Sequence, residues 1–306
     1  MMSGGSGYDE GFGFIPPSPK AISQTEQAKY ESEVEGLLQD ALGDFNDRDT
    51  AAIRQHLDTI EQAISNDVDG SMQMTFGGST EKHTYVNGLS DVDMLVHLNN
   101  TSLADKSPKE VLSHFAQMLE QRLPRTDVKI GDLAVTVTFS DGHAIQLLPA
   151  IKTASGFKIA QPGGSQWSSV ISPRRFAKRL TEVNQQQSGK VIPAIKLIKA
   201  MNDKLPGPNR LSGYHIESLA IEVFQDYNGR QTYRKMIRHF WDSTGKQVLN
   251  PIKDRTGQSV HVDDYLGVRN SAARQRVSGA IGKICISLDR AEQSRSTINW
   301  ENLISP

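Results

Sequence analysis

Residues 76–98 place two aspartates in an otherwise apolar segment, shortly after a glycine-rich turn: FGGSTEKHTYVNGLSDVDMLVHL. The segment from Asp91 to Leu98 is typical of a strand, and alternate side chains of a strand lie on the same face. Asp91 and Asp93 are therefore predicted to converge on one point. Two neighbouring carboxylates repel each other and lose hydration unless a cation lies between them, so the pattern predicts a divalent-metal site on a sheet.

The residues before the aspartates predict a phosphate-binding turn. Residues 72–76 are typical of a short strand, Gly77-Gly78-Ser79 of a tight turn, and residues 80–86 of a short helix. Glycine lets a phosphate approach the backbone closely, and free N–H groups at a helix start suit phosphate oxygens. Each motif alone is usually an ordinary turn or strand end, but their joint order predicts two-metal phosphoryl transfer.

The remaining pattern divides the chain into two parts. A Gly/Pro/Ser-rich stretch, Ser155–Pro173, separates a region of strands and helices from a mainly helical region. We expect a bilobal α/β fold: a flexible segment at 1–20, a core of mixed sheet with bracing N-terminal helices at 21–165, and a helical lobe at 166–306. The tail Asn299–Pro306 is predicted to be flexible.

Hydrophobic periodicity predicts the individual elements. A long helix is expected from Ser23, with Tyr30, Val34, Leu37, Leu38, Ala41 and Leu42 on one stripe. In the rest of the first part we expect helices at 50–65 and 108–122, strands at 132–139 and 143–148, and a hairpin turn at 140–142. In the second part we expect helices at 174–185, 190–204, 212–227, 230–243 and 270–292.

Composition excludes several classes of protein. With 34 Lys+Arg against 35 Asp+Glu, the net charge of −1 gives no global positive field and argues against long nucleic acid as an obligatory partner. The only cysteine, Cys285, can form no internal disulfide, and its apolar surroundings suggest a buried position. The histidines show no pair at metal-ligand spacing, which argues against a zinc site. No long apolar run or secretory signal occurs, so we expect a cytoplasmic protein without a membrane partner.

The same residues resemble a known family. Gly78-Ser79 with Thr84, and Ser90-Asp91-Val92-Asp93, are similar to the active-site signature of the cGAS/DncV-like nucleotidyltransferases of bacterial anti-phage defence. These enzymes are relatives of oligoadenylate synthases within the polymerase-β superfamily. The similarity continues at 147–150 (LLPA), 212–219 (SGYHIESL) and 262–267 (VDDYLG), and it covers residues from about 25 to 295.

This resemblance implies a function and a cofactor. Such enzymes join ATP, and in some cases GTP, CTP or UTP, into cyclic di- or trinucleotides, which activate an effector that harms the infected cell. By resemblance, Ser79 holds the donor phosphate, while Asp91 and Asp93 bind two Mg²⁺ or Mn²⁺ ions. The metal ions would activate the attacking ribose hydroxyl and offset charge on the departing pyrophosphate. A regulatory protein partner is compatible with this assignment.

Gln146 departs from the family pattern, which usually has a third carboxylate two residues before the Leu-Pro-Ala stretch. Glutamine can offer a neutral oxygen to a metal ion but cannot accept a proton at pH 7. Three interpretations follow: a two-acid site whose metal-bound hydroxyl loses its proton to water, a nearby acid such as Asp132 or Asp141 acting instead, or a weakened enzyme. We favour the first.

Three positions in the helical part are weaker predictions. Lys196 and Lys199 share a helix face; helical lysines are ordinarily solvated, but the family uses a lysine of the corresponding helix against the triphosphate. Ser212 is predicted to cap the next helix, and by resemblance it also reaches the donor phosphate.

Two other functions stay open at the level of sequence. A transferase of the same fold could modify RNA, a protein side chain or a small molecule, and its labelled product would then be that acceptor. Alternatively, the chain could be a nucleotide sensor in which Gln146 marks lost catalysis. That reading predicts nucleotide binding without pyrophosphate release.

Overall fold

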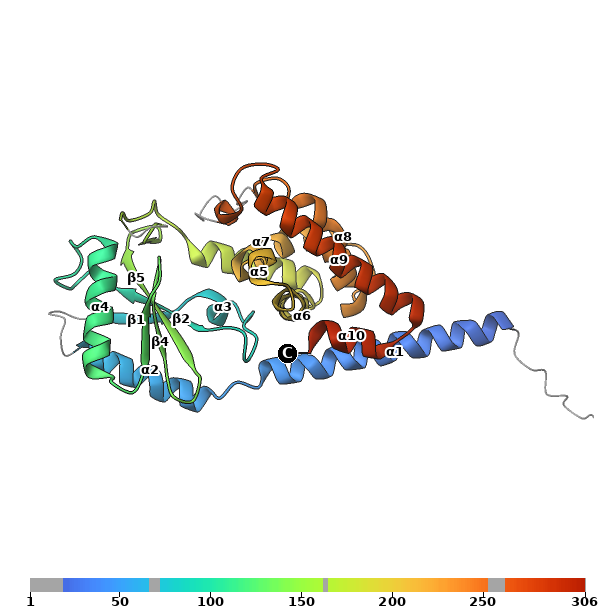
Figure 1. Ribbon diagram of the computed structural model, residues 1–306, viewed down its shortest axis with the longest axis horizontal. Coiled ribbons are helices and arrows are strands. Elements are labelled where there is room, and N and C mark those ends of the chain that lie inside the picture. Colours follow the sequence, from blue (N-terminus) through green and yellow to red (C-terminus); the bar gives the residue numbers. More distant parts are fainter. Residues whose placement is uncertain (1–18, 66–71, 162–164, 253–261, 306) are drawn as a thin grey trace, which may run out of the picture.

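The computed structural model describes residues 19–65, 72–161, 165–252 and 262–305. The prediction of flexibility at residues 1–18 lies outside this range, and so does His261, one of the histidines considered for a zinc site. A sheet lobe and a helical lobe lie side by side, and the long helix α1 runs along the helical lobe before the chain enters the sheet lobe (Figure 1). The elements are α1 (Pro19–Asn46), α2 (Thr50–Ser65), β1 (Gln73–Phe76), α3 (Gly78–Glu81), β2 (Val92–His97), α4 (Pro108–Arg122), β3 (Asp127–Ile130), β4 (Val135–Thr138), β5 (Ala144–Lys152), β6 (Phe157–Ile159), α5 (Pro173–Gln186), α6 (Val191–Asp203), α7 (Gly213–Phe224), α8 (Tyr233–Gln247), α9 (Ala272–Ser294) and α10 (Thr297–Ile304). Short 3₁₀ turns occur at Gly207–Asn209 and Asp264–Leu266.

The sheet is mixed, as predicted. Its strands follow the order β1-β2-β5-β4-β3, with β6 paired to β5. β2 and β5 are parallel, and the other pairs are antiparallel. In the parallel pair Asp93 lies opposite Gln146. The two residues therefore share one face of the sheet, because register partners point to the same side.

Helices α2 and α4 cover the other face of the sheet. Their apolar side chains pack against alternate residues of the central strands, including Val92, Met94, Ile145 and Leu147. The helix predicted at 108–122 is confirmed, and its start is fixed by a capping box between Ser107 and Glu110. The edge strand β3 and the three-residue β6 were not predicted, since both are too short to give a clear alternating pattern.

The apolar stripe of α1 packs in the helical lobe rather than on the sheet. Tyr30, Val34 and Leu38 are buried in one core with residues of α6, α8 and α9. The buried Arg234 of α8 strengthens this contact, because its guanidinium pairs with Glu31 of α1 at 2.6 Å and with Glu292 of α9 at 2.5 Å. Of the two N-terminal helices, only α2 braces the sheet.

The prediction of a flexible C-terminal tail was wrong. Residues 297–304 form α10, and its Trp300 is fully buried. The indole Nε1 of Trp300 donates to the hydroxyl of Tyr30 at 3.0 Å, and that hydroxyl donates to the carbonyl of Ala291 at 2.9 Å. Among the described helices, none has the combination of length and apolar character needed to cross a membrane.

Candidate functional site

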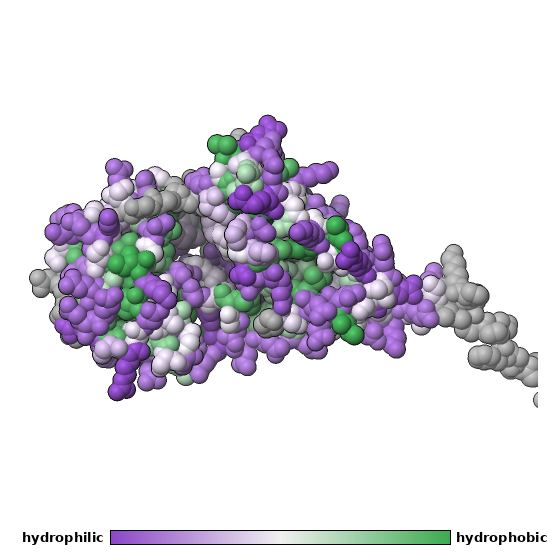
Figure 2. Space-filling model, viewed as in Figure 1, coloured by the Kyte–Doolittle hydropathy of each residue, from purple (hydrophilic) through white to green (hydrophobic). Residues whose placement is uncertain are grey.

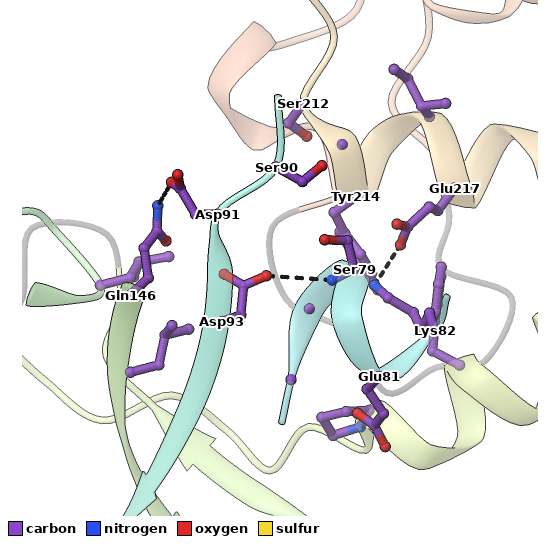
Figure 3. A pocket seen from close by; sticks show the side chains of 18 of the residues that line it. Ser79, Glu81, Lys82, Ser90, Asp91, Asp93, Gln146, Ser212, Tyr214 and Glu217 are labelled. Atoms are coloured by element: carbon purple, nitrogen blue, oxygen red, sulfur yellow. Dashed lines mark hydrogen bonds and ion pairs between the residues drawn. The ribbon is translucent and has the colours of Figure 1, made fainter. Parts of the chain in front are cut away.

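A cleft of about 610 Å³ lies between the two lobes. In the space-filling view the surface is hollowed where the lobes meet (Figure 2). The sheet lobe contributes the turn at 77–79 and the ends of β2 and β5, and the helical lobe contributes α6 and the start of α7. The polar residues that converge on this cleft include Ser79, Lys82, Ser90, Asp91, Asp93, Gln146, Ser212, Tyr214 and Glu217 (Figure 3). Lys199 of α6 also lines it. The size and shape of the cleft suit a nucleotide-sized ligand.

The glycine-rich turn lies directly against Asp93. The backbone N–H of Gly77 donates to the carbonyl of Asp93 at 2.8 Å, and that of Ser79 donates to its Oδ2 at 3.3 Å. Gly78 has a φ of +50°, and a Cβ at this position would lie 1.7 Å from Oδ2 of Asp93. Only glycine therefore allows the turn to approach the carboxylate this closely.

The helix that follows the turn is shorter than predicted. α3 ends at Glu81, whereas the sequence predicted a helix over residues 80–86. His83 adopts a left-handed φ of 57°, which is incompatible with continuing a right-handed helix. The chain then leads to the loop that carries Ser90 and Asp91 into β2.

Asp91, Asp93 and Gln146 form the acidic side of the cleft (Figure 3). Nε2 of Gln146 donates to Oδ2 of Asp91 at 2.5 Å. Burial raises the pKa of Asp93 above its usual value, and the nearby charges of Asp91 and Glu217 raise it further, against the opposing effects of the Ser79 N–H and Lys82. Because Asp91 and Asp93 repel each other and Asp93 is largely buried, a cation beside these carboxylates would stabilise them.

The donor atoms of this acidic side fit a hard divalent cation. Asp91 and Asp93 supply carboxylate oxygens only, and oxygen ligands are preferred by Mg²⁺ and Mn²⁺. The burial and the raised pKa of Asp93 make it a carboxylate that gains from a cation. Gln146 contributes an N–H to Asp91 in this arrangement, and thereby orients the carboxylate.

A buried charge network joins the two lobes at the wall of the cleft. Glu217 of α7 is 1% exposed, and its carboxylate pairs with Lys82 at the end of α3 and with Lys199 of α6, the latter at 2.8 Å. Thr84 donates to the same carboxylate at 2.5 Å. Burial alone would raise the pKa of Glu217, but the ammonium groups of the two lysines lower it to about 2. Both lysines line the cleft, where they provide positive charge for an anionic ligand.

The geometry agrees with the comparison of the sequence with protein families. Residues 29–184 match the family model described as Second Messenger Oligonucleotide or Dinucleotide Synthetase domain. The chain belongs to this family. No curated protein sequence matches it closely enough to add to this assignment.

Several solved structures share the fold of this chain. Bradyrhizobium diazoefficiens CdnG in complex with GTP has a TM-score of 0.64 and 12% identity, covering 89% of this chain and 97% of that chain. Elizabethkingia meningoseptica CdnE cyclic dinucleotide synthase with GTP and Apcpp has a TM-score of 0.60 and 17% identity, covering 77% and 91%. A complex of Escherichia coli MS115-1 CdnC with HORMA-deltaN has a TM-score of 0.56 and 17% identity, covering 94% and 96%.

The structure brings most of the predicted site residues together. Gly78, Ser79, Asp91, Asp93, Gln146, Lys199 and Ser212 all line the cleft. Ser212 is the N-cap of α7, as predicted, because its side chain accepts the backbone N–H of His215 at 3.2 Å. Its own backbone N–H donates to the hydroxyl of Tyr265 at 2.9 Å.

Two predicted nucleotide-binding residues lie elsewhere. Lys196 is 5% exposed. Its ammonium donates to the side chain of Asn46 at the end of α1, and it lies 4.2 Å from the ring centroid of Tyr85 in the loop before β2. Thr84 is fully buried in the network around Glu217. Neither residue lines the cleft, and their predicted contact with nucleotide therefore has no support from their positions.

Sequence reasoning missed Lys82 and Glu217. Glu217 lies within the SGYHIESL segment, but nothing local distinguishes it from a surface glutamate. Lys82 follows the predicted phosphate turn by three residues, which was the one available signal. The acids considered as substitutes for a third carboxylate, Asp132 and Asp141, do not line the cleft.

Proposed function

We propose that this chain is a metal-dependent nucleotidyltransferase that joins ATP, alone or with another nucleoside triphosphate, into a cyclic di- or trinucleotide messenger. The observation that carries the proposal is the pair Asp91 and Asp93 facing the Gly77–Ser79 turn inside a cleft between two lobes. Membership of the second-messenger synthetase family supports nucleotide cyclisation as the reaction of this site. The structures of its fold relatives with GTP support triphosphates as substrates.

The proposed reaction uses the two sides of the cleft for different groups. A ribose hydroxyl of one nucleotide attacks the α-phosphorus of another, the bond to the β-phosphate breaks, and pyrophosphate leaves. The turn at Ser79 and the ammonium groups of Lys82 and Lys199 hold phosphate oxygens. Asp91 and Asp93 hold the Mg²⁺ or Mn²⁺ ions, which supply charge stabilisation and a lowered hydroxyl pKa when bound.

Gln146 is proposed to orient Asp91 instead of acting as a base. Its amide cannot take the hydroxyl proton, so this proton passes to solvent water in the cleft. The hydrogen bond from Gln146 to Asp91 keeps one carboxylate oxygen in place and leaves the other for the cation. A site with two acids is therefore sufficient in this proposal.

The proposal extends to the biological setting. The substrates are cytoplasmic metabolites, so we place the reaction in the cytoplasm, with the product activating a downstream effector in defence against phage. The complex of a fold relative with a HORMA protein supports the expectation of a regulatory protein partner.

Product analysis tests the proposed function. Purified protein is incubated with the four ribonucleoside triphosphates and Mg²⁺ or Mn²⁺, treated with phosphatase, and examined by mass spectrometry. We expect a phosphatase-resistant cyclic nucleotide that is absent from the Asp91→Asn/Asp93→Asn variant. Nucleotide found attached to RNA, protein or a small molecule would instead establish a transferase of the same fold that acts on another acceptor.

A nucleotide sensor is the second candidate function, and Gln146 is the observation that favours it. A sensor would bind ATP in the cleft and release no pyrophosphate, with any metal and with any added partner. Equilibrium ATP binding measured beside the product assay separates this outcome from a protein that binds no nucleotide.

A further inference from the structure

Two histidines and one aspartate meet on the sheet lobe outside the cleft. His56 belongs to α2, and Asp141 and His143 belong to the turn between β4 and β5. The three side chains each offer one ligand atom, and these atoms all lie within 4.8 Å of one another. Figure 1 shows α2 passing close to this end of the β4–β5 hairpin. Sequence spacing could not reveal this cluster, because His56 lies 85 positions before Asp141, the nearer of its two partners in the chain.

The neighbours of the cluster hold its ligand atoms toward one another. Oδ1 of Asp141 accepts the backbone N–H of His143 at 3.1 Å, which directs Oδ2 toward the two rings. Oδ2 lies 2.7 Å from Nε2 of His56 and 3.1 Å from Nδ1 of His143. The ring of His56 stacks on Phe139 with centroids 3.7 Å apart, so its orientation is fixed by packing.

The Nδ1 atom of His143 is held by its contact with the Asp141 carboxylate. This atom is buried and lies 3.1 Å from Oδ2 of Asp141, without a well-directed hydrogen bond. A metal ion between the ring nitrogen and the carboxylate oxygen would bind both atoms.

The ligand set indicates which metal would bind. Two imidazoles with one carboxylate suit Zn²⁺ and related transition metals, whereas Mg²⁺ prefers oxygen ligands alone. Tetrahedral Zn²⁺ with bonds of about 2.0–2.1 Å separates its ligand atoms by about 3.3 Å. The distances from Oδ2 of Asp141 would therefore lengthen by about 0.6 Å and about 0.2 Å, and small side-chain rotations would adjust the distance between the two ring nitrogens, which lie within 4.8 Å of each other. Asp141 is exposed, so water can reach the fourth position.

We propose that His56, Asp141 and His143 form a transition-metal site, most suited to Zn²⁺, that ties α2 to the β4–β5 hairpin. The site is distinct from the cleft. Ile145 and Leu147 pack against α2 and α4, and His143 continues their alternation on that face, whereas Gln146 faces the cleft. Binding would hold the start of β5 against α2 and leave Asp91 and Asp93 free for their own ions.

Metal titration of untagged full-length protein tests the proposal. The protein is treated with a chelator, transferred to chelator-free buffer and titrated with Zn²⁺ by calorimetry, with Co²⁺ absorption as a second readout of ligand geometry. We expect one Zn²⁺ per chain that remains in the Asp91→Asn/Asp93→Asn variant. His56→Gln, His143→Gln and Asp141→Asn should each weaken this binding by at least about tenfold. His114→Gln, a histidine of α4 outside the cluster, should bind as the wild type does.

A thermal readout covers the case in which a variant folds poorly. Zn²⁺ should raise the melting temperature of the wild type by a few degrees, since it binds the native state, and should leave that of Asp141→Asn unchanged. Asp141→Asn keeps the size of an exposed side chain, and its fold is checked by circular dichroism. Equal Zn²⁺ affinity in the wild type and all three cluster variants, or no Zn²⁺ bound by the wild type, would overturn the proposal.

Discussion

Gly78 is the residue whose identity the cleft constrains most tightly. A Cβ would meet Asp93 at 1.7 Å and would sit on a backbone with a φ of +50°. We expect Gly78→Ala to lower the rate of synthesis at least about 100-fold, because displacement of the turn or of Asp93 misplaces the reacting groups. Gly88 is a matched control, with a φ of +77° and no atom within 4 Å of its Cβ position. Gly88→Ala should lose about 1 kcal/mol of stability and keep its activity; equal activity of the two variants in the product assay would contradict this account.

Gln146 gives a second prediction for a single residue. Gln146→Ala removes the N–H that Asp91 accepts, so kcat should fall about 10- to 100-fold, as for other groups that orient metal ligands. Thr136 is its register partner on β4 and lies outside the cleft lining. Thr136→Ala should leave kcat nearly unchanged. If Gln146→Ala retained full kcat, the orienting role would be excluded.

Individual residues were predictable where the chemistry is local in sequence. Asp91, Asp93 and the glycine turn lie within one short segment, and strand alternation alone places both acids on one face. Glu217 and Lys82 meet only after the lobes pack, so no local pattern could pair them. For the same reason Lys196 and Lys199 could not be told apart by helix periodicity, and only Lys199 lines the cleft.

At the level of elements, α10 shows how a short terminal helix can anchor a fold. We expect Trp300→Ala to reduce the free energy of unfolding by about 3–5 kcal/mol, because it leaves a large cavity and removes the indole N–H that the Tyr30 hydroxyl accepts. Ile298 of the same helix is 65% exposed, and Ile298→Ala should change stability by less than about 0.5 kcal/mol. Urea unfolding measures both; similar losses for the two variants would refute the anchoring role.

Elements with long, regular patterns were predicted well, and short ones were not. The helices at 50–65 and 108–122 are confirmed to the residue, since each has a clear apolar face and α4 also has a strong start signal. β3, β6 and α10 have four, three and eight residues, and each is fixed by contacts with distant parts of the chain. Only tertiary structure could define them.

At the scale of the whole molecule, Glu217 couples the lobes in a pH-dependent way. Its pKa is about 2 in the folded protein against a usual value of 4.5. The stabilisation is therefore complete above about pH 4.5 and is lost as the pH falls toward 2, since the unfolded chain binds the proton first. Comparing wild type with Glu217→Gln by denaturant unfolding should give a difference that is largest near neutral pH and shrinks below pH 4.5. The exposed Glu61→Gln is the control, and a pH-independent difference for Glu217→Gln would contradict the coupling.

Asp91 and Asp93 are proposed to form a metal-dependent catalytic site in the cleft, and this proposal is tested by measuring pyrophosphate release from ATP. Release is followed while Mg²⁺ or Mn²⁺ is titrated into chelator-treated wild type, Asp93→Asn and Asp132→Asn, the last being an exposed acid outside the cleft lining. We expect metal-dependent release by the wild type and Asp132→Asn, and a loss of at least about 1,000-fold in Asp93→Asn. Release that needs no metal ion, or that survives in Asp93→Asn, would contradict it.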